Sequence, residues 1–506
     1  MRHGLDDVRA GFDVSADAVV VGSGAGGAVA AANLARAGMK VVVLEAGPEV
    51  RPEDMVRDAP RFLARHFWDG GLRIIYGTAP SPSLQARCLG GGTVVNSAIM
   101  LPLPAWVRAE WRDETGVKHF DGPELDQAYA RVFARCRVAP TPEHVLGRRN
   151  QLAREAISGV LGEPGGPLPR AVHDCEGSSD CLTGCGGSRK QSVDRVYLPE
   201  AEEHGAEIFT HAEATRVLTE GRRAVGVEGD VIALPGWRKV GRFRVRAKHV
   251  ILAAGTMQTP VLLQRSGINP RGLVGATLFC HIGGAVVGIM DEVVDPWVGA
   301  TQGWGAISKR VHGLKYEGLW ASPSVLMVRW GDVGRRFVER LDEVRRAAVI
   351  AAVYRGKVSG SVRATRSGAP SMRLFIPEEN VDPVMRGLKA AADALLQLGA
   401  RYVHSGIATV VDEMKNERDT ASLVSGRVTA KHLTMTLNHT FGSCRMTATE
   451  SGPVDADGRL RGLEGLYLCD ASVFPSPSAV NPQATIMALS DITSRKLAGL
   501  RLDEPV

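Results

Sequence analysis

Three glycines near the start of the chain have the spacing of a phosphate-binding turn. Gly22, Gly24 and Gly27 form the pattern G-x-G-x-x-G directly after the apolar run 18–21. The first glycine permits a tight turn, the second lets the backbone approach a pyrophosphate, and the third lets helix and strand pack closely. Glu45 follows the next apolar run, where a carboxylate suits the hydroxyl groups of a ribose and repels a 2′-phosphate. The unit predicts a dinucleotide site, but it does not separate NAD from FAD.

Three cysteines form a second group that could do chemistry. Cys175, Cys181 and Cys185 lie close together in a chain with only eight cysteines. Grouped cysteines outside a disulfide-rich scaffold favour metal ligation or redox chemistry. Three thiolates suit an iron–sulfur cluster, and together with His173 they suit a zinc site. A third interpretation is that they are thiols that hold no metal.

The elements that must position these groups form a split α/β layer. Strand, glycine turn, helix and strand at the N-terminus are typical of a doubly wound parallel sheet. Two further strands of this layer are predicted at 249–254 and 466–470. The helices that follow them are expected to begin close to Pro260 and at Pro482, because proline is favoured in a first helical turn.

The segment between these parts has a different character. Residues 348–354 and their surroundings suit antiparallel strands. The predicted fold class is therefore α/β, with a Rossmann-like dinucleotide-binding domain split in sequence and an inserted α+β domain that contains an antiparallel sheet. We expect a first dinucleotide-binding part over 15–282, the inserted domain over 283–430 and a C-terminal return to the dinucleotide-binding layer over 431–506.

Composition excludes several classes of protein. The 61 basic and 55 acidic residues give a net charge of only +6, and no run of basic residues indicates a nucleic-acid partner. No apolar run approaches the ~18 residues of a membrane-spanning helix. The first 17 residues lack the apolar core of a secretory signal, so the expected location is the cytoplasm.

Four segments, taken together, resemble the glucose–methanol–choline (GMC) family of FAD-dependent oxidoreductases. They are the dinucleotide unit 18–47, the glycine-rich stretch 87–96, the strand–turn–helix segment 255–267, and a C-terminal pair at 439–446 and 470–487. The second segment has the form seen in the cholesterol oxidase-like and long-chain alcohol oxidase-like branch. The resemblance covers essentially the whole chain and implies an oxidoreductase that acts on the CH–OH group of an alcohol. It also implies that the split layer is a Rossmann-like FAD-binding domain and that the inserted α+β domain, with its antiparallel sheet, is the substrate domain.

The resemblance also implies where the cofactor binds. Val95 occupies the position of the histidine that links flavin covalently in some members, so FAD is expected to be non-covalent. The implied cofactor-binding residues come from every part of the FAD layer: Gly22, Gly24, Gly27, Glu45, Ala46, Gly91, Thr93, Asn96, Ala214, Asp470, Ala471, Pro482 and Gln483.

Two side chains take the family's catalytic positions. His439 is the implied base that removes the hydroxyl proton while the hydride passes to flavin N5, and histidine suits that task near neutral pH. Asn481 is expected to hold the substrate oxygen. A helix beginning at Pro482 would direct its positive end toward the flavin pyrimidine. His432, seven residues before His439, has no such context and is interpreted as structural.

Other functions on the same fold stay open at this stage. A hydroxynitrile lyase-like enzyme and a fatty acid photodecarboxylase-like enzyme would hold flavin without oxidising an alcohol, and a non-catalytic flavoprotein is a third alternative. The second segment hints at a bulky or apolar secondary alcohol, with sugars and long-chain alcohols also possible. The electron acceptor could be oxygen, a quinone or a redox protein, and an iron–sulfur cluster would favour the last two.

Overall fold

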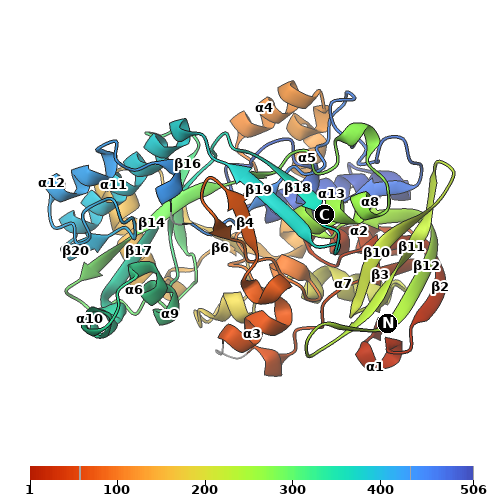
Figure 1. Cartoon of the computed structure of the whole chain (residues 1–506), viewed down its shortest axis with the longest axis horizontal. Coiled ribbons are helices and arrows are strands. Elements are labelled where there is room, and N and C mark those ends of the chain that lie inside the picture. Colours follow the sequence, from red (N-terminus) through yellow and green to blue (C-terminus); the bar gives the residue numbers. More distant parts are fainter. Residues whose placement is uncertain (56–58, 434, 505–506) are drawn as a thin grey trace.

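The largest layer of the computed structural model, which describes residues 1–55, 59–433 and 435–504, is an eight-stranded mixed sheet (Figure 1). Strands β1, β9, β3, β2, β12 and β22 run parallel to their neighbours, and β11 and β10 extend the sheet in antiparallel fashion. In chain order the strands are β1 (Arg2–His3), β2 (Phe12–Val21), β3 (Val41–Leu44), β9 (Glu207–Phe209), β10 (Ala212–Glu220), β11 (Arg223–Ala233), β12 (Arg238–Leu252) and β22 (Leu466–Leu468).

The parallel strands form because their apolar runs are buried on both faces. The last four residues of β2 and all of β3 are buried, as expected for strands covered on both sides by helices. Helix α2 (Ala25–Arg36) packs against α7 (Val193–Glu203) and α13 (Gln483–Ala498). Ten of the twelve residues of α2 are buried, and their small side chains permit this close packing.

Strand register brings distant parts of the sequence to one edge of this sheet. Val21, the last residue of β2, lies opposite Leu252 of β12, and Leu252 lies opposite Leu468 of β22. The carboxyl ends of the three strands therefore meet, although they come from the beginning, middle and end of the chain. This confirms the predicted α/β fold with a layer that the chain leaves and re-enters.

A second, antiparallel sheet lies in the other half of the molecule (Figure 1). Its order is β20 (Ala400–His404), β14 (Ile282–Met290), β17 (Ala347–Tyr354), β16 (Leu314–Gly318), β15 (Trp304–Ile307) and β7 (Gly166–Pro167). Helix α11 (Val381–Gln397) packs on β14, β17 and β20. The predicted strand at 348–354 is thus confirmed, and it lies inside this sheet.

Smaller sheets and surface helices complete the described chain. The remaining strands are β4 (Ile74–Gly77), β5 (Ser81–Pro82), β18 (Ser359–Ala364) and β19 (Pro370–Phe375) in one sheet, and the pairs β6 (Val138–Pro140) with β8 (Pro169–Ala171) and β13 (Phe279–Cys280) with β21 (Thr440–Phe441). The remaining α-helices are α1 (Leu5–Val8), α3 (Ala59–His66), α4 (Ala105–Thr115), α5 (Pro123–Arg135), α6 (Gly147–Arg154), α8 (Gly255–Arg265), α9 (Pro323–Trp330), α10 (Arg335–Glu343) and α12 (Glu417–Thr420). The domain boundaries at 282 and 430 stay a prediction.

Helix α8 begins earlier than the start predicted from the position of Pro260. The helix starts at Gly255, so Pro260 lies inside it and cannot donate to the carbonyl of Thr256 one turn before. The hydroxyl of Ser443 donates to that carbonyl at 2.6 Å. A side chain from a distant segment thus replaces the missing backbone bond, which local sequence could not reveal.

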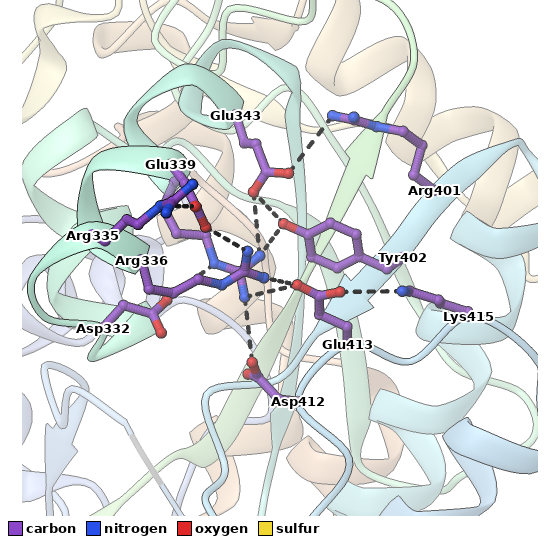
Figure 2. A network of polar contacts seen from close by, with 11 residues as sticks. Asp332, Arg335, Arg336, Glu339, Glu343, Arg401, Tyr402, Asp412, Glu413 and Lys415 are labelled. Atoms are coloured by element: carbon purple, nitrogen blue, oxygen red, sulfur yellow. Dashed lines mark hydrogen bonds and ion pairs between the residues drawn. The ribbon is translucent and has the colours of Figure 1, made fainter.

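A buried arginine fixes the helix pair α9–α10 to the second sheet. The side chain of Arg340 is fully buried and lies among four carboxylates, Asp332, Glu343, Asp412 and Glu413, beside the ring of Tyr402 in β20 (Figure 2). Its distances to these carboxylates are 3.0–3.4 Å. One side chain therefore connects α10 with β20 and the loop that follows β20.

Candidate cofactor and active site

The main cavity opens where the parallel strands of the first sheet end. It has a volume of about 630 Å³. Its walls include Val21 at the end of β2, Leu44 at the end of β3, Ala253 after β12 and Asp470 after β22. The carboxyl ends of parallel strands are where open α/β sheets bind their ligands.

The glycine turn forms one wall of the cavity, and at Gly22, Gly26 and Gly27 a larger residue would not fit. Gly22 has a φ of +99°, which an L side chain rarely adopts. A Cβ on Gly27 would lie 1.9 Å from the carbonyl oxygen of Gly22, and one on Gly26 would lie 1.7 Å from that of Cys469. Gly24 borders the cavity, where a Cβ would lie no closer than 3.9 Å to the Cα of Gly91. Gly24 thus exposes backbone to a ligand, while Gly27 packs strand against helix and does not border the cavity.

Ser23 joins the two glycine segments to the predicted ribose-binding acid. Its hydroxyl donates to Glu45 Oε2 at 2.6 Å and accepts from the backbone N–H of Gly90 at 3.0 Å. The N–H of Gly47 donates to Glu45 Oε1 at 2.9 Å. Burial raises the pKa of Glu45, and these donors oppose that shift. The backbone N–H of Ser23 also donates to Oε2 at 3.1 Å, so Oε1 is the carboxylate oxygen that can still accept a hydrogen bond from a hydroxyl group.

Hydrogen bonds between segments far apart in the sequence hold another part of the cavity wall in place. Asn96 Nδ2 donates to Gln483 Oε1 at 2.5 Å, joining the second glycine segment to the first residue of α13. Asp470 accepts from the backbone N–H groups of Gly255 and Ser472 at 2.9 and 2.8 Å. The Asn96–Gln483 bond fixes the N-terminus of α13 at the cavity, where the free N–H groups of a first helical turn favour negative charge.

These walls fit FAD. They offer two helix N-termini for anionic groups, a buried acid for a ribose and a glycine turn that leaves room for a pyrophosphate. Every residue predicted to bind the cofactor borders the cavity except Gly27: Gly22, Gly24, Glu45, Ala46, Gly91, Thr93, Asn96, Ala214, Asp470, Ala471, Pro482 and Gln483. Their roles in binding stay predictions.

The predicted base lies on the same cavity, beside a second histidine. Cys280 of β13 pairs with Thr440 of β21, which places His281 opposite His439. The two Nδ1 atoms are 3.1 Å apart, and the rings meet edge to face. Because Nδ1 of His439 contacts His281, Nε2 is the nitrogen left for the cavity, which His439 borders.

Burial keeps both histidines uncharged. It lowers the pKa of His439 to about 4; the charge of Lys315 lowers that pKa further, while Glu317 raises it. The pKa of His281 is well below its ordinary value, chiefly through burial and then through His439, Lys315 and Arg355. A neutral His439 can accept a proton near pH 7.

Asn481 borders the cavity together with His439 and is held by a charged pair. Lys315 Nζ donates to Asn481 Oδ1 and to Glu317 Oε1, each at 2.5 Å. Gln302 Nε2 donates to the other oxygen of Glu317 at 2.7 Å, and Gln302 also borders the cavity.

Sequence reasoning missed His281, Lys315, Glu317 and Gln302. A weak signal was present in the segment 314–318, Leu-Lys-Tyr-Glu-Gly, because side chains two apart on a strand share one face. The partners of that face come from distant segments, so sequence alone gave no reason to bury the charges.

The cysteine group lacks the geometry of a metal site, and none of its three cysteines borders this cavity, although Leu182 and Thr183 between them do. Cys181 and Cys185 are buried and Cys175 is half-buried, and Arg170 donates to the sulfur of Cys175 at 3.1 Å. Among the residues that the structure describes, no three Cys, His, Asp or Glu side chains are placed to hold a metal ion. Two of the three interpretations of the group, the iron–sulfur cluster and the zinc site with His173, therefore find no support.

Two family models match the chain and identify the family to which it belongs. The GMC oxidoreductase N-terminal model matches residues 16–283 and the GMC oxidoreductase C-terminal model matches residues 353–490. The chain belongs to the GMC oxidoreductase family. As a GMC oxidoreductase it is an FAD-dependent oxidoreductase, which confirms the resemblance found in the sequence.

Individual relatives agree with this GMC assignment. A GMC-type oxidoreductase of Mycobacterium tuberculosis is 33% identical over 501 residues, covering 96% of this chain and 77% of that protein. A long-chain-alcohol oxidase of Arabidopsis thaliana is 29% identical over 526 residues, covering 97% of this chain and 68% of that protein.

Solved structures share the fold. Pyridoxine 4-oxidase from Mesorbium loti superposes with a TM-score of 0.69 at 17% identity, covering 96% of this chain and 99% of that one. A formate oxidase variant from Aspergillus oryzae gives 0.70 at 15% identity, covering 96% and 98%. In the described part of this GMC oxidoreductase, no helix has the length and apolar character needed to cross a bilayer.

Proposed function

We propose that this GMC oxidoreductase oxidises an alcohol to a carbonyl compound, with His439 as the base and Asn481 as the group that holds the substrate oxygen. The observation that carries the proposal is the placement of both side chains on the wall of the cavity that fits FAD. The names of the long-chain-alcohol oxidase and pyridoxine 4-oxidase relatives support an alcohol as the substrate.

The chemistry divides between cofactor and chain. When bound, FAD supplies the acceptor for the hydride that leaves the alcohol carbon. His439 takes the hydroxyl proton at Nε2, which requires the tautomer whose Nδ1–H donates to Nδ1 of His281. The Asn481 amide donates to the oxygen from which the proton leaves and so orients the carbon that carries the hydride.

The base is tested by anaerobic mixing with a panel of alcohols that includes long-chain, sterol and sugar members. The His439→Ala variant should slow flavin reduction roughly 10²–10⁴-fold, the usual contribution of a positioned base, and should retain its FAD. Asn481→Ala should slow it less, because Asn481 orients the substrate and transfers no proton.

His432→Ala is the matched control and should reduce at the wild-type rate, since His432 contacts Thr429 and does not border the cavity. Equal rates in His439→Ala and wild type would remove the assignment of the base. A flavin that no alcohol bleaches would favour the lyase or the photochemical alternative.

We further propose that FAD is bound without a covalent link. Val95 borders the cavity at the position implied for the linking histidine, and its aliphatic side chain forms no bond to flavin. Acid precipitation should release all flavin into the supernatant as FAD. Yellow colour retained in the pellet would contradict the proposal. Rates of reoxidation with oxygen, a quinone and a dye would then identify the acceptor.

A further inference from the structure

Strand β16 carries a buried ion pair inside the antiparallel sheet. Lys315 and Glu317 are 1% and 3% exposed, and their position two residues apart directs both side chains to one face of the strand. Removing two charges from water costs several kcal/mol per ion, and such pairs often add nothing to stability. A requirement other than stability would therefore explain their retention.

The partner that Lys315 reaches belongs to the proposed active site. Its ammonium group contacts Asn481 Oδ1 as well as Glu317. A lysine ammonium has donors and no acceptor, so the atom of the Asn481 amide that faces it must be the oxygen. The amide nitrogen Nδ2, a donor, is then the group of Asn481 that remains for the cavity.

Glu317 holds the lysine in this position. One oxygen of Glu317 accepts from Lys315 and the other accepts from Gln302. The chain of hydrogen bonds from Gln302 through Glu317 and Lys315 to Asn481 begins and ends at the cavity wall. Because all four side chains are at least nine-tenths buried, the amide has little freedom to turn over.

We propose that Lys315, held by Glu317, is a positioning residue that orients the Asn481 amide so that its N–H groups face the oxygen of the alcohol. The inference rests on the proposed function and adds to it two residues from the second sheet. An amide turned the other way would present an acceptor to an oxygen that is losing its proton, which would repel the developing negative charge.

The same pair acts electrostatically on the base. The groups that act on His439 are His281, Lys315 and Glu317, with Arg355 acting on His281. Loss of the positive charge of Lys315 removes a cause of the low pKa of His439, so that pKa should rise. The acid limb of the pH profile should then move to higher pH.

The test compares Lys315→Met with Lys315→Arg in the FAD-loaded protein. At saturating alcohol, Lys315→Met should slow flavin reduction roughly ten- to hundredfold, the effect of losing one charge-assisted hydrogen bond. Lys315→Arg keeps a donor-only cation and should recover part of the rate. Exposed Lys309, between β15 and β16, provides a control: Lys309→Met should leave rate and pH profile unchanged.

A readout without turnover separates this inference from the proposed function. Titration of ¹³C-labelled histidines by NMR should show a higher pKa for His439 in Lys315→Met than in wild type. If Lys315→Met folds poorly, Lys315→Met combined with Glu317→Gln removes both charges at similar volume and should fold, with the same loss of rate.

A folded, FAD-loaded Lys315→Met protein with the wild-type rate, acid limb and His439 pKa would overturn the inference. A wild-type protein that no alcohol reduces would overturn the proposed function instead. The His439 titration and a crystal structure showing the Asn481 amide would still decide the role of Lys315.

Discussion

At the scale of single residues, the protonation of His439 depends on its surroundings more than on its type. Burial and the neighbouring lysine lower its pKa to about 4, although an unperturbed histidine titrates near ~6.5. A histidine with that pKa is neutral over the whole physiological range. It can act as a base there without first losing a proton to solvent.

The pH dependence of flavin reduction should report this shift. Because protonated His439 cannot accept a second proton, the rate should fall as pH decreases through the pKa of His439. We expect the rate with a non-ionising alcohol to stay level down to about pH 5 and to fall towards about pH 4. Stopped-flow reduction across this range measures it. A midpoint close to the ordinary histidine value would show that burial does not control the base in the working enzyme.

At the scale of elements, helix α2 needs glycine for close packing against a neighbouring segment as well as for the tight turn that precedes the helix. Gly26 lies against the carbonyl of Cys469, immediately after β22, so the N-terminal and C-terminal parts of the FAD layer touch at this residue. Any side chain there would separate α2 from the segment that carries Asp470.

Gly26→Ala should therefore reduce both stability and flavin content. A Cβ placed 1.7 Å from a backbone oxygen forces backbone movement, and we expect a loss of at least about 3 kcal/mol, the upper end of ordinary overpacking. Gly159→Ala is the matched control, because no atom lies within 4 Å of its added Cβ. Thermal unfolding and bound FAD per chain measure both variants. Equal behaviour of the two would refute the contact.

The pair α9–α10 depends in the same way on Arg340. The loop before α9 contributes Trp320 and Ser322 to the cavity wall, and Arg340 joins α10 to the segments on either side of it through its ion pairs. Arg340→Met leaves several carboxylates without their cation, and breaking such a buried pair costs about 3–5 kcal/mol.

Amide hydrogen exchange measures the resulting loss of local stability in α10. Amide protection in 335–343 should fall more than roughly a hundredfold in Arg340→Met, with protection in β2 and β3 unchanged. Arg335→Met should change little, because Arg335 is almost fully exposed and, within the described part of the chain, pairs with Glu339 on its own helix. Unchanged protection in Arg340→Met would mean that the pair is held by its apolar contacts.

Sequence patterns predicted those parts of the molecule whose structure is determined by residues close together in the chain. The unit around Gly22 and the strand at 348–354 carry their own signals, since apolar period and turn glycines act within a few residues. Lys315 is different: its role depends on Asn481, which reaches it only after two sheets have formed. Pro260 was misleading for the same reason, because the hydroxyl that compensates for it belongs to Ser443.

At the scale of the whole molecule, the cavity is lined by residues from distant parts of the chain. Its walls combine the first sheet, the β13–β21 pair through His439, and the second sheet's surroundings through Gln302 and Trp320. A ligand that fills it would contact segments from the beginning, middle and end of the chain at the same time. Folding and cofactor binding should therefore be coupled.

Removal of FAD should lower the unfolding temperature of the whole chain. Ligand binding to the folded state adds about 2.7 kcal/mol when free ligand is a hundred times its dissociation constant. Scanning calorimetry of FAD-free protein with increasing FAD should show one transition that moves steadily upward. Two transitions, with only one responding, would show that the second sheet unfolds independently of the cofactor.

The eight cysteines differ in exposure, which makes them selective sites for chemical labelling. Seven of the eight thiols are buried and only Cys175 is half-buried, with no disulfide among them. A maleimide dye applied to the native protein should therefore attach at a single position, Cys175, which does not border the cavity. The other thiols would react only as the chain opens, so the dye-to-protein ratio would count unfolded molecules in a mixed sample. The native sequence therefore supplies one labelling site for the folded protein, and the reactivity of the other thiols reports the unfolded fraction of a sample.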